Sequence, residues 1–184
     1  MKALEKLPHL LAAQDWAAAE KLLKRAATAK AVPVAVLYNL GRVLMEQGKW
    51  APARVWLRRA VQAAPDHAHA WFELARTDLE LGDMAAALTR FERALALDPA
   101  DADARLNAGQ LAVRLGQYAT AVTLLRPLAG HSAQADAWLY RATAEARDPQ
   151  VDLYRRTLWA RPDARALALT TAARVSKGQL PLTF

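Results

Sequence analysis

The 34-residue stretch AHAWFELARTDLELGDMAAALTRFERALALDPAD, from Ala68 to Asp101, carries a pattern that recurs along the chain. Within it, Met84 is followed three residues later by alanine. The residues at the same place in other units are Trp16, Trp50 and Tyr118, and each is followed by alanine at the same distance. Together with Met84, these four positions are spaced 34 residues apart. Self-similarity at a fixed period of this length is the signature of a repeat architecture. We expect this column to be a packing site that holds the helices of each unit together.

Each unit of this pattern predicts two helices. In the unit that begins at Val34, apolar residues recur every three or four positions over about residues 34–47 and again over about 50–63, which is typical of helices buried on one face. Gly48 separates the two segments and favours a left-handed cap, and Pro65 follows the second because proline cannot continue a helix. The sequence therefore predicts antiparallel helix pairs.

Small side chains occupy two further columns. These positions are Gly41, Ala75 and Gly109 on the first helices and Ala53, Ala87 and Ala121 on the second helices. We expect the two helices of a pair to cross there, because a larger side chain would push them apart. The columns continue less regularly toward the N-terminus, where Gln14 takes the place of the turn glycine.

The composition excludes several classes of protein. The 184 residues are 54% hydrophobic and include no cysteine, which removes disulfides, thiol catalysis and thiolate metal sites. No apolar run is long enough to span a membrane, and the N-terminus does not resemble a secretory signal, so we expect a cytoplasmic protein. A net charge of +7 favours an acidic peptide, an anionic surface or nucleic acid as partner, without choosing among them.

The sequence shows no catalytic or metal-binding constellation. The glycines are isolated, and His67 and His69 are two residues apart at the start of a predicted helix, so they point to different faces. We therefore predict no catalytic residue, no metal and no cofactor. Asp78 alone is unusual, because its column holds Leu44 and Ala112 in the neighbouring repeats. We interpret it as a partly exposed carboxylate bonded to a nearby arginine, with a binding-groove carboxylate as the alternative.

The pattern of residues 68–101 resembles the tetratricopeptide repeat, whose unit is a 34-residue helix-turn-helix. The residues that carry the resemblance are Trp71, Leu74, Ala75, Gly82, Ala87, Phe91, Ala94 and Pro99. The resemblance implies an all-α, right-handed superhelical array of antiparallel helix pairs, an α-solenoid of about eleven helices. We expect a single array over residues 1–184. Its parts are a degenerate helix pair (2–30), regular repeats (34–67, 68–101, 102–131), a degenerate repeat (133–162) and a capping helix (163–178).

The same resemblance implies a binding surface, because in that family the first helices of successive repeats line a concave groove. The matching positions are Tyr38, Asn39, Arg42, His69, Phe72, Glu73, Arg76, Asn107, Gln110 and Arg114. Asparagine amides can bond a peptide backbone, arginines can pair with carboxylates, and aromatic rings can pack on apolar side chains. An ordinary solvated helix face is the alternative interpretation of this set.

The family's carboxylate clamp for acidic C-termini is not reproduced, because Tyr38, Arg42 and Glu73 stand at its positions. Several of the basic residues are predicted on second helices, away from the groove. They are Arg54, Arg58, Arg59, Arg90 and Arg93. Nucleic acid is disfavoured as a partner, since no Lys/Arg cluster in the sequence is interleaved with aromatic residues.

These features favour a non-catalytic scaffold or adaptor that binds a peptide or protein segment, and the positive net charge favours an acidic one. Two alternatives remain. In bacteria such repeats are often joined to an enzyme domain, for example a transferase or an oxygenase, and the apolar stretch Leu180 to Phe184 is consistent with a recruiting module of a larger enzyme. An exposed Trp138 or Trp159 on a degenerate end unit would instead favour self-association into a homo-oligomer.

Overall fold

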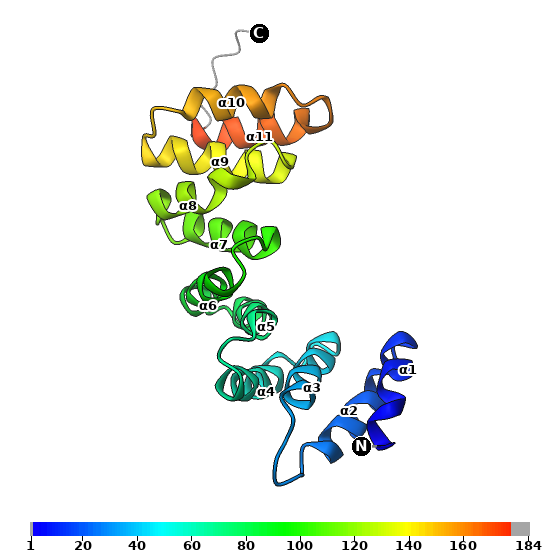
Figure 1. The fold of residues 1–184 in the computed structure, drawn as a ribbon. Coiled ribbons are helices and arrows are strands. Elements are labelled where there is room, and N and C mark those ends of the chain that lie inside the picture. The colour runs from blue at the N-terminus through cyan, green and yellow to red at the C-terminus, as the bar shows by residue number, and fades with distance from the viewer. Residues whose placement is uncertain (1, 178–184) are drawn as a thin grey trace. The chain divides into compact units, whose positions relative to one another are not determined.

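The computed structural model describes residues 2–177, which form α-helices and short 3-10 helices without a strand (Figure 1). The described residues contain eleven α-helices, so the predicted all-α class and the number of helices are confirmed. The chain divides into two compact units, Met1–Pro99 and Ala100–Phe184, which we call the N-terminal unit and the C-terminal unit. The expectation that residues 1–184 behave as one array stays a prediction.

Three consecutive helix pairs make up the N-terminal unit. Its elements are η1 (Lys2–Lys6), α1 (Leu7–Ala12), α2 (Trp16–Ala26), α3 (Val34–Glu46), α4 (Trp50–Ala63), α5 (Ala68–Glu80) and α6 (Met84–Leu97). Helix α3 packs on α4 and α5 packs on α6, while α4 also packs on α5. Leu40, Leu57 and Leu74 are at most 1% exposed between these helices, because the apolar stripes predicted by the helical period face one another.

Glu20 ties the first helix pair to the second. Its carboxylate lies 2.6 Å from Nζ of Lys24 and 2.7 Å from Nζ of Lys49, and it accepts a hydrogen bond of 2.9 Å from the amide of Gln47. The bonds from Lys24 and then Lys49 lower the pKa of Glu20 from 4.5 to about 2, although burial acts in the opposite direction. An ionised Glu20 therefore fastens α2 to the turn between α3 and α4.

The C-terminal unit starts with a regular helix pair and becomes less regular. Its elements are α7 (Ala102–Arg114), α8 (Tyr118–Leu125), η2 (Arg126–Leu128), α9 (Ala133–Ala146), α10 (Val151–Trp159), η3 (Pro162–Ala164) and α11 (Arg165–Val175). Helix α9 packs on α7, α8, α10 and α11, so it is the centre of this unit. Helix α8 ends at Leu125 and continues as the 3-10 turn η2, because Pro127 cannot donate the next helical hydrogen bond.

A buried carboxylate, Asp136, holds the irregular part of the C-terminal unit together. Asp136 is 1% exposed and accepts hydrogen bonds of 2.7 Å from the backbone N–H of Gly130 and from Nε of Arg161. Arg161 also donates to the carbonyl of Gly130 at 2.5 Å. The loop before α9 is thereby fixed to the segment after α10.

The helix crossings lie at the small residues, as predicted. A Cβ atom added at Gly41 would lie 2.5 Å from Cγ of Leu57, and one added at Gly109 would lie 2.5 Å from Cδ2 of Leu125. Four alanines of the two small-residue columns are 0% exposed: Ala53, Ala75, Ala87 and Ala121. Leu57 therefore fills the space beside Gly41, and Leu125 fills the space beside Gly109.

The turns between paired helices use a left-handed residue, which confirms the predicted glycine caps. Gly48, Gly82 and Gly116 have φ values of 69°, 82° and 74°. Gln14 takes the same conformation, with φ of 54°, at the position where the first pair lacks the glycine. A side chain with a Cβ is strained in that region, so the α1–α2 turn is less favourable than the glycine turns.

The column that opens each second helix is less buried than its periodicity suggests. Trp16, Trp50 and Tyr118 are half-buried, whereas Met84 is 38% exposed. Met84 is therefore the most exposed member of this column, and the role of the column in holding each pair together stays a prediction. The alanine column three residues later allows the close contact, because a small side chain lets the helices approach.

Candidate functional site

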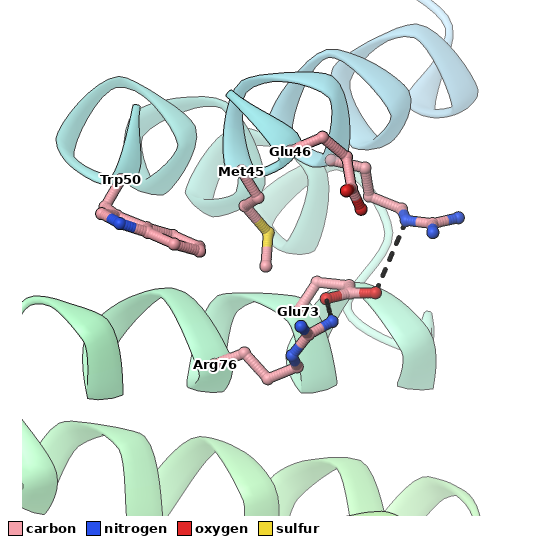
Figure 2. A pocket seen from close by; sticks show the side chains of 6 residues that line it. Met45, Glu46, Trp50, Glu73 and Arg76 are labelled. Carbon is pink, nitrogen blue, oxygen red and sulfur yellow. Dashed lines mark hydrogen bonds and ion pairs between the residues drawn. The ribbon is translucent and has the colours of Figure 1, made fainter. Parts of the chain in front are cut away.

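In the N-terminal unit, Glu73 on α5 is the centre of a charged cluster between α3 and α5 (Figure 2). Its side chain is 9% exposed, and Oε2 lies 2.9 Å from Nη1 of Arg76 while Oε1 lies 3.5 Å from Nε of Arg42. Both arginine side chains are about half exposed, at 49% and 48%. A buried carboxylate needs such partners to be tolerated. In turn it holds two guanidinium groups near the surface of the unit.

A small open pocket of about 60 Å³ adjoins this cluster. Its lining residues are Arg42, Met45, Glu46, Trp50, Glu73 and Arg76. Trp50 and Met45 form an apolar side, and the charged side chains lie at the other end (Figure 2). The pocket is large enough for a small side-chain group and offers that group apolar contact next to fixed charges.

Tyr38 and the two histidines lie where α3 meets the start of α5. The ring of Tyr38 is 4.9 Å from that of His67, and the guanidinium carbon of Arg42 is 5.9 Å from the Tyr38 ring. Burial raises the pKa of the Tyr38 hydroxyl. His67 is the N-cap of α5, since its Nδ1 accepts a hydrogen bond of 3.2 Å from the N–H of Ala70. His69 is exposed, with its ring 6.4 Å from that of His67.

Two of the predicted polar groove residues bond within their own helices. The side-chain N–H of Asn39 donates to the carbonyl of Ala35 at 2.8 Å, and that of Asn107 donates to the carbonyl of Asp103 at 2.7 Å. Each amide keeps its oxygen and a second N–H for other partners. Phe72 is half-buried and packs edge-to-face on the buried Phe91 with ring centres 5.4 Å apart, so part of its surface belongs to the core.

The C-terminal unit carries the remaining predicted residues on α7, where Gln110 is half-buried and Arg114 is exposed. The guanidinium carbon of Arg114 lies 5.9 Å from the ring centre of Trp138 on α9, and that of Arg141 lies 5.5 Å from the same ring. Trp138 is half-buried. The sequence prediction did not assign Trp138 or Arg141 to a groove.

A shift in the repeat explains that omission. Helix α7 begins at Ala102 and α9 begins at Ala133, 31 residues later rather than 34. A comparison of the two N-caps, Asp101 and Ser132, would have restored the register, because both side chains accept a hydrogen bond from the backbone three residues on. In that register Arg141 corresponds to Gln110.

Asp78 differs from its prediction. It is 0% exposed rather than partly exposed, and it faces α4 and α6 through its partners Arg54 and Arg90. Nη1 of Arg90 contacts Oδ2, and Nη1 of Arg54 lies 3.7 Å from Oδ1, but neither oxygen accepts a well-directed hydrogen bond within the described chain. Burial raises the pKa of Asp78, while Arg90 and then Arg54 oppose this effect. A groove role for Asp78 is excluded by its burial.

No group of three or more His, Cys, Asp or Glu side chains within residues 2–177 is arranged to hold a metal ion. Over the same part of the chain, no helix has both the length and the apolar character needed to cross a membrane.

Comparisons with known proteins agree with this architecture. Two family models, both described as tetratricopeptide repeat, match residues 33–100 and 78–143, which together are more than half of the chain. No significant match is found among curated proteins.

Among solved structures, one similar protein is YrrB, which is described as a TPR protein with an unusual peptide-binding site. Its TM-score is 0.82, and it is 17% identical over 94% of this chain and 91% of that one. A tetratricopeptide repeat protein from Parabacteroides merdae has a TM-score of 0.78 and 20% identity over 96% of this chain and 72% of that one. MamA has a TM-score of 0.75 and 19% identity over 99% and 96%. At these identities the likeness concerns the fold alone.

Proposed function

Because this chain belongs to the tetratricopeptide repeat family, we propose that it is a non-catalytic interaction module that binds an extended peptide or protein segment on the first helices of its repeats. The observation that most supports this proposal is the cluster of Arg42, Glu73 and Arg76, in which a buried carboxylate holds two half-exposed guanidinium groups at the surface. Groups that are fixed before binding lose little conformational freedom when a ligand arrives.

The chemistry of this face suits an extended segment. The half-exposed guanidinium groups of Arg42 and Arg76 can bond carbonyl or carboxylate oxygens, and the amide oxygen of Asn39 can accept from a peptide N–H. The pocket beside Met45 and Trp50 offers a place for one apolar side chain. That YrrB is described as having a peptide-binding site agrees with this class of ligand, although its likeness to this chain is in fold.

Selection from a random displayed-peptide library tests the proposal. Peptides selected on the wild-type chain should lose about tenfold or more in affinity for a variant with Asn39→Ala and Arg76→Ala, because charge-assisted and amide hydrogen bonds are removed. The control variant carries Arg58→Ala and Gln62→Ala on the second helix α4, and should bind as the wild type does. Equal binding to all three proteins would refute the groove assignment.

Self-association is a second candidate, favoured by apolar side chains at the surface of the C-terminal unit. Leu153, Trp159, Leu167 and Leu169 are 51%, 40%, 38% and 43% exposed on α10 and α11. A second copy of the chain is the partner that we propose for this surface. Light scattering should then give a mass above that of the monomer, and Trp159→Ser should lower it; a monomer at high concentration would exclude this candidate.

The proposal of a recruiting module for an enzyme depends on Leu180 to Phe184, which lie outside the described residues. The sequence of the gene beyond codon 184 would test it directly.

A further inference from the structure

The cluster of Arg114, Trp138 and Arg141 differs in charge from the surface around Glu73. The two guanidinium carbons lie 5.9 and 5.5 Å from the indole centre, and neither arginine forms an ion pair within the described residues. Glu145, one helical turn beyond Arg141, is exposed and is not paired with it. Two cations of the C-terminal unit are therefore held together by an aromatic ring without a compensating carboxylate.

The sequence columns show that this surface departs from the regular repeat. Arg114 stands where the two preceding repeats carry Glu46 and Glu80, so the charge at that position is reversed. In the register set by the N-caps, Trp138 stands where the preceding repeats carry Glu73 and Asn107. An indole thus replaces the group that neutralises the arginines in the N-terminal unit.

We propose that this cluster binds a carboxylate-rich segment of a partner protein, with Arg114 and Arg141 each pairing with an acidic side chain and Trp138 packing on the chain between them. The inference rests on the proposed function, since it names the partner class of a first-helix surface. Arginine favours carboxylates because its planar fork can donate two parallel hydrogen bonds. The indole N–H of Trp138 makes no hydrogen bond within residues that the structure describes, so it is a further available donor.

An acidic peptide fits this surface better than a nucleic acid does. Nucleic-acid affinity comes mainly from many phosphate contacts along a backbone, and two arginines can neutralise only two phosphates. The neighbouring polar groups on α7 are the amides of Asn107 and Gln110, which match peptide N–H and carbonyl groups.

The test uses the full chain and three labelled probes in fluorescence anisotropy at low ionic strength. The probes are a glutamate–glycine repeat peptide, the matching glutamine–glycine peptide and an oligothymidylate of equal charge. The variant Arg114→Gln with Arg141→Gln is compared with Arg165→Gln and Arg174→Gln, which remove the same charge from exposed positions of α11. Circular dichroism verifies that each protein is folded.

We expect the wild type to bind the glutamate peptide in preference to the glutamine peptide. The Arg114 and Arg141 variant should bind it about tenfold or more weakly, while the Arg165 and Arg174 variant should change by less than about twofold. Equal weakening in the two variants would reduce the effect to net charge and overturn the proposal. Tighter binding of the oligothymidylate, lost in the same variant, would overturn it in favour of nucleic acid.

This experiment can succeed or fail separately from the one above, because it uses a defined peptide and residues of the C-terminal unit. If displayed peptides are never selected but the glutamate peptide binds through Arg114 and Arg141, the proposed peptide site around Glu73 is wrong and the proposed acidic site in the C-terminal unit stands. If selected peptides depend on Arg76 but the glutamate peptide does not bind, only the proposal that the C-terminal unit binds an acidic segment is wrong.

Discussion

Asp78 in the N-terminal unit and Asp136 in the C-terminal unit are both buried carboxylates, 0% and 1% exposed, yet they are held in different ways. Asp136 accepts hydrogen bonds of 2.7 Å from the N–H of Gly130 and from Arg161. Within residues 2–177, Asp78 lies beside two arginines but accepts no well-directed hydrogen bond, and burial raises its pKa. Burial of a charge is tolerated well only when its lone pairs are used. Asp136 thus joins two segments of its unit, whereas the burial of Asp78 is compensated only by its arginine partners.

The largest effect should follow the loss of the well-bonded carboxylate. We expect Asp136→Ala to lower the free energy of unfolding by about 3 kcal/mol, because it leaves Arg161 and the Gly130 N–H without their partner. Urea denaturation measures this change. The control is Asp152→Ala, whose 65% exposed side chain pairs with Arg155 and should contribute about 0.5 kcal/mol or less. Similar losses in both variants would contradict the role of Asp136.

Replacing Asp78 together with its partner Arg90 should change the free energy of unfolding only a little. Asp78→Leu alone leaves Arg90, which is 16% exposed, unpaired, so we expect a loss of about 2 kcal/mol. Asp78→Leu with Arg90→Leu should instead be neutral or more stable by about 1 kcal/mol, since a buried ion pair often does no better than apolar packing. The matched pair Asp136→Leu with Arg161→Leu should remain destabilised, and thermal unfolding of the three variants would show whether the two sites differ.

The pH dependence of the free energy of unfolding tests a third carboxylate, Glu20. Its pKa is lowered to about 2 in the folded chain, so its contribution is present above the unfolded value near 4.5 and is lost as the pH falls toward 2. We expect Glu20→Gln to lower the stability at pH 7 by about 1–2 kcal/mol and to match the wild type near pH 2, in unfolding measured across this range.

Asp78 should respond in the opposite direction, because its folded pKa is raised. Its protonated form is favoured by folding, so the wild type should gain stability relative to Asp78→Asn as the pH falls through the folded pKa. A parallel pH dependence of the two proteins would contradict this assignment.

The smallest effect concerns a turn. Gln14 has the left-handed φ that Gly48, Gly82 and Gly116 adopt without strain. Gln14→Gly should therefore raise the stability of the N-terminal unit by about 0.5–1 kcal/mol, while Gly48→Gln should lower it by about 1 kcal/mol. Thermal unfolding monitored by circular dichroism would detect both changes. An unchanged midpoint for Gln14→Gly would mean that the first pair does not limit unfolding.

The helix boundaries could be predicted because local signals set them. The turn at Gly48 and the apolar period from Val34 place the ends of α3 and α4 to within one residue of the structure. The buried site of Asp78 could not be predicted in the same way. Its partners Arg54 and Arg90 come from two other helices, and only packing brings them to α5.

The candidate surfaces were predicted in part. The resemblance to the tetratricopeptide repeat, carried along the 34-residue period, implied Glu73 and Arg114 as groove positions, because both lie in regular repeats. It did not reveal that Glu73 is buried as the partner of two arginines, since burial depends on how α3 and α5 meet. The three-residue shift before α9 moved Trp138 and Arg141 out of the column, so periodicity alone could not find them.

The left-handed turns also bear on the order in which the chain opens. Within the described residues, the non-glycine residues with positive φ are Gln14, Arg147 and Lys177, and none lies in a regular repeat. Backbone strain at the α1–α2 turn, at the α9–α10 turn and after α11 lowers the free energy needed to unfold those segments locally. Amide hydrogens of α1 and α11 should accordingly exchange with solvent through frequent partial opening, while those of α5 and α7 exchange only through rarer, larger openings of their units.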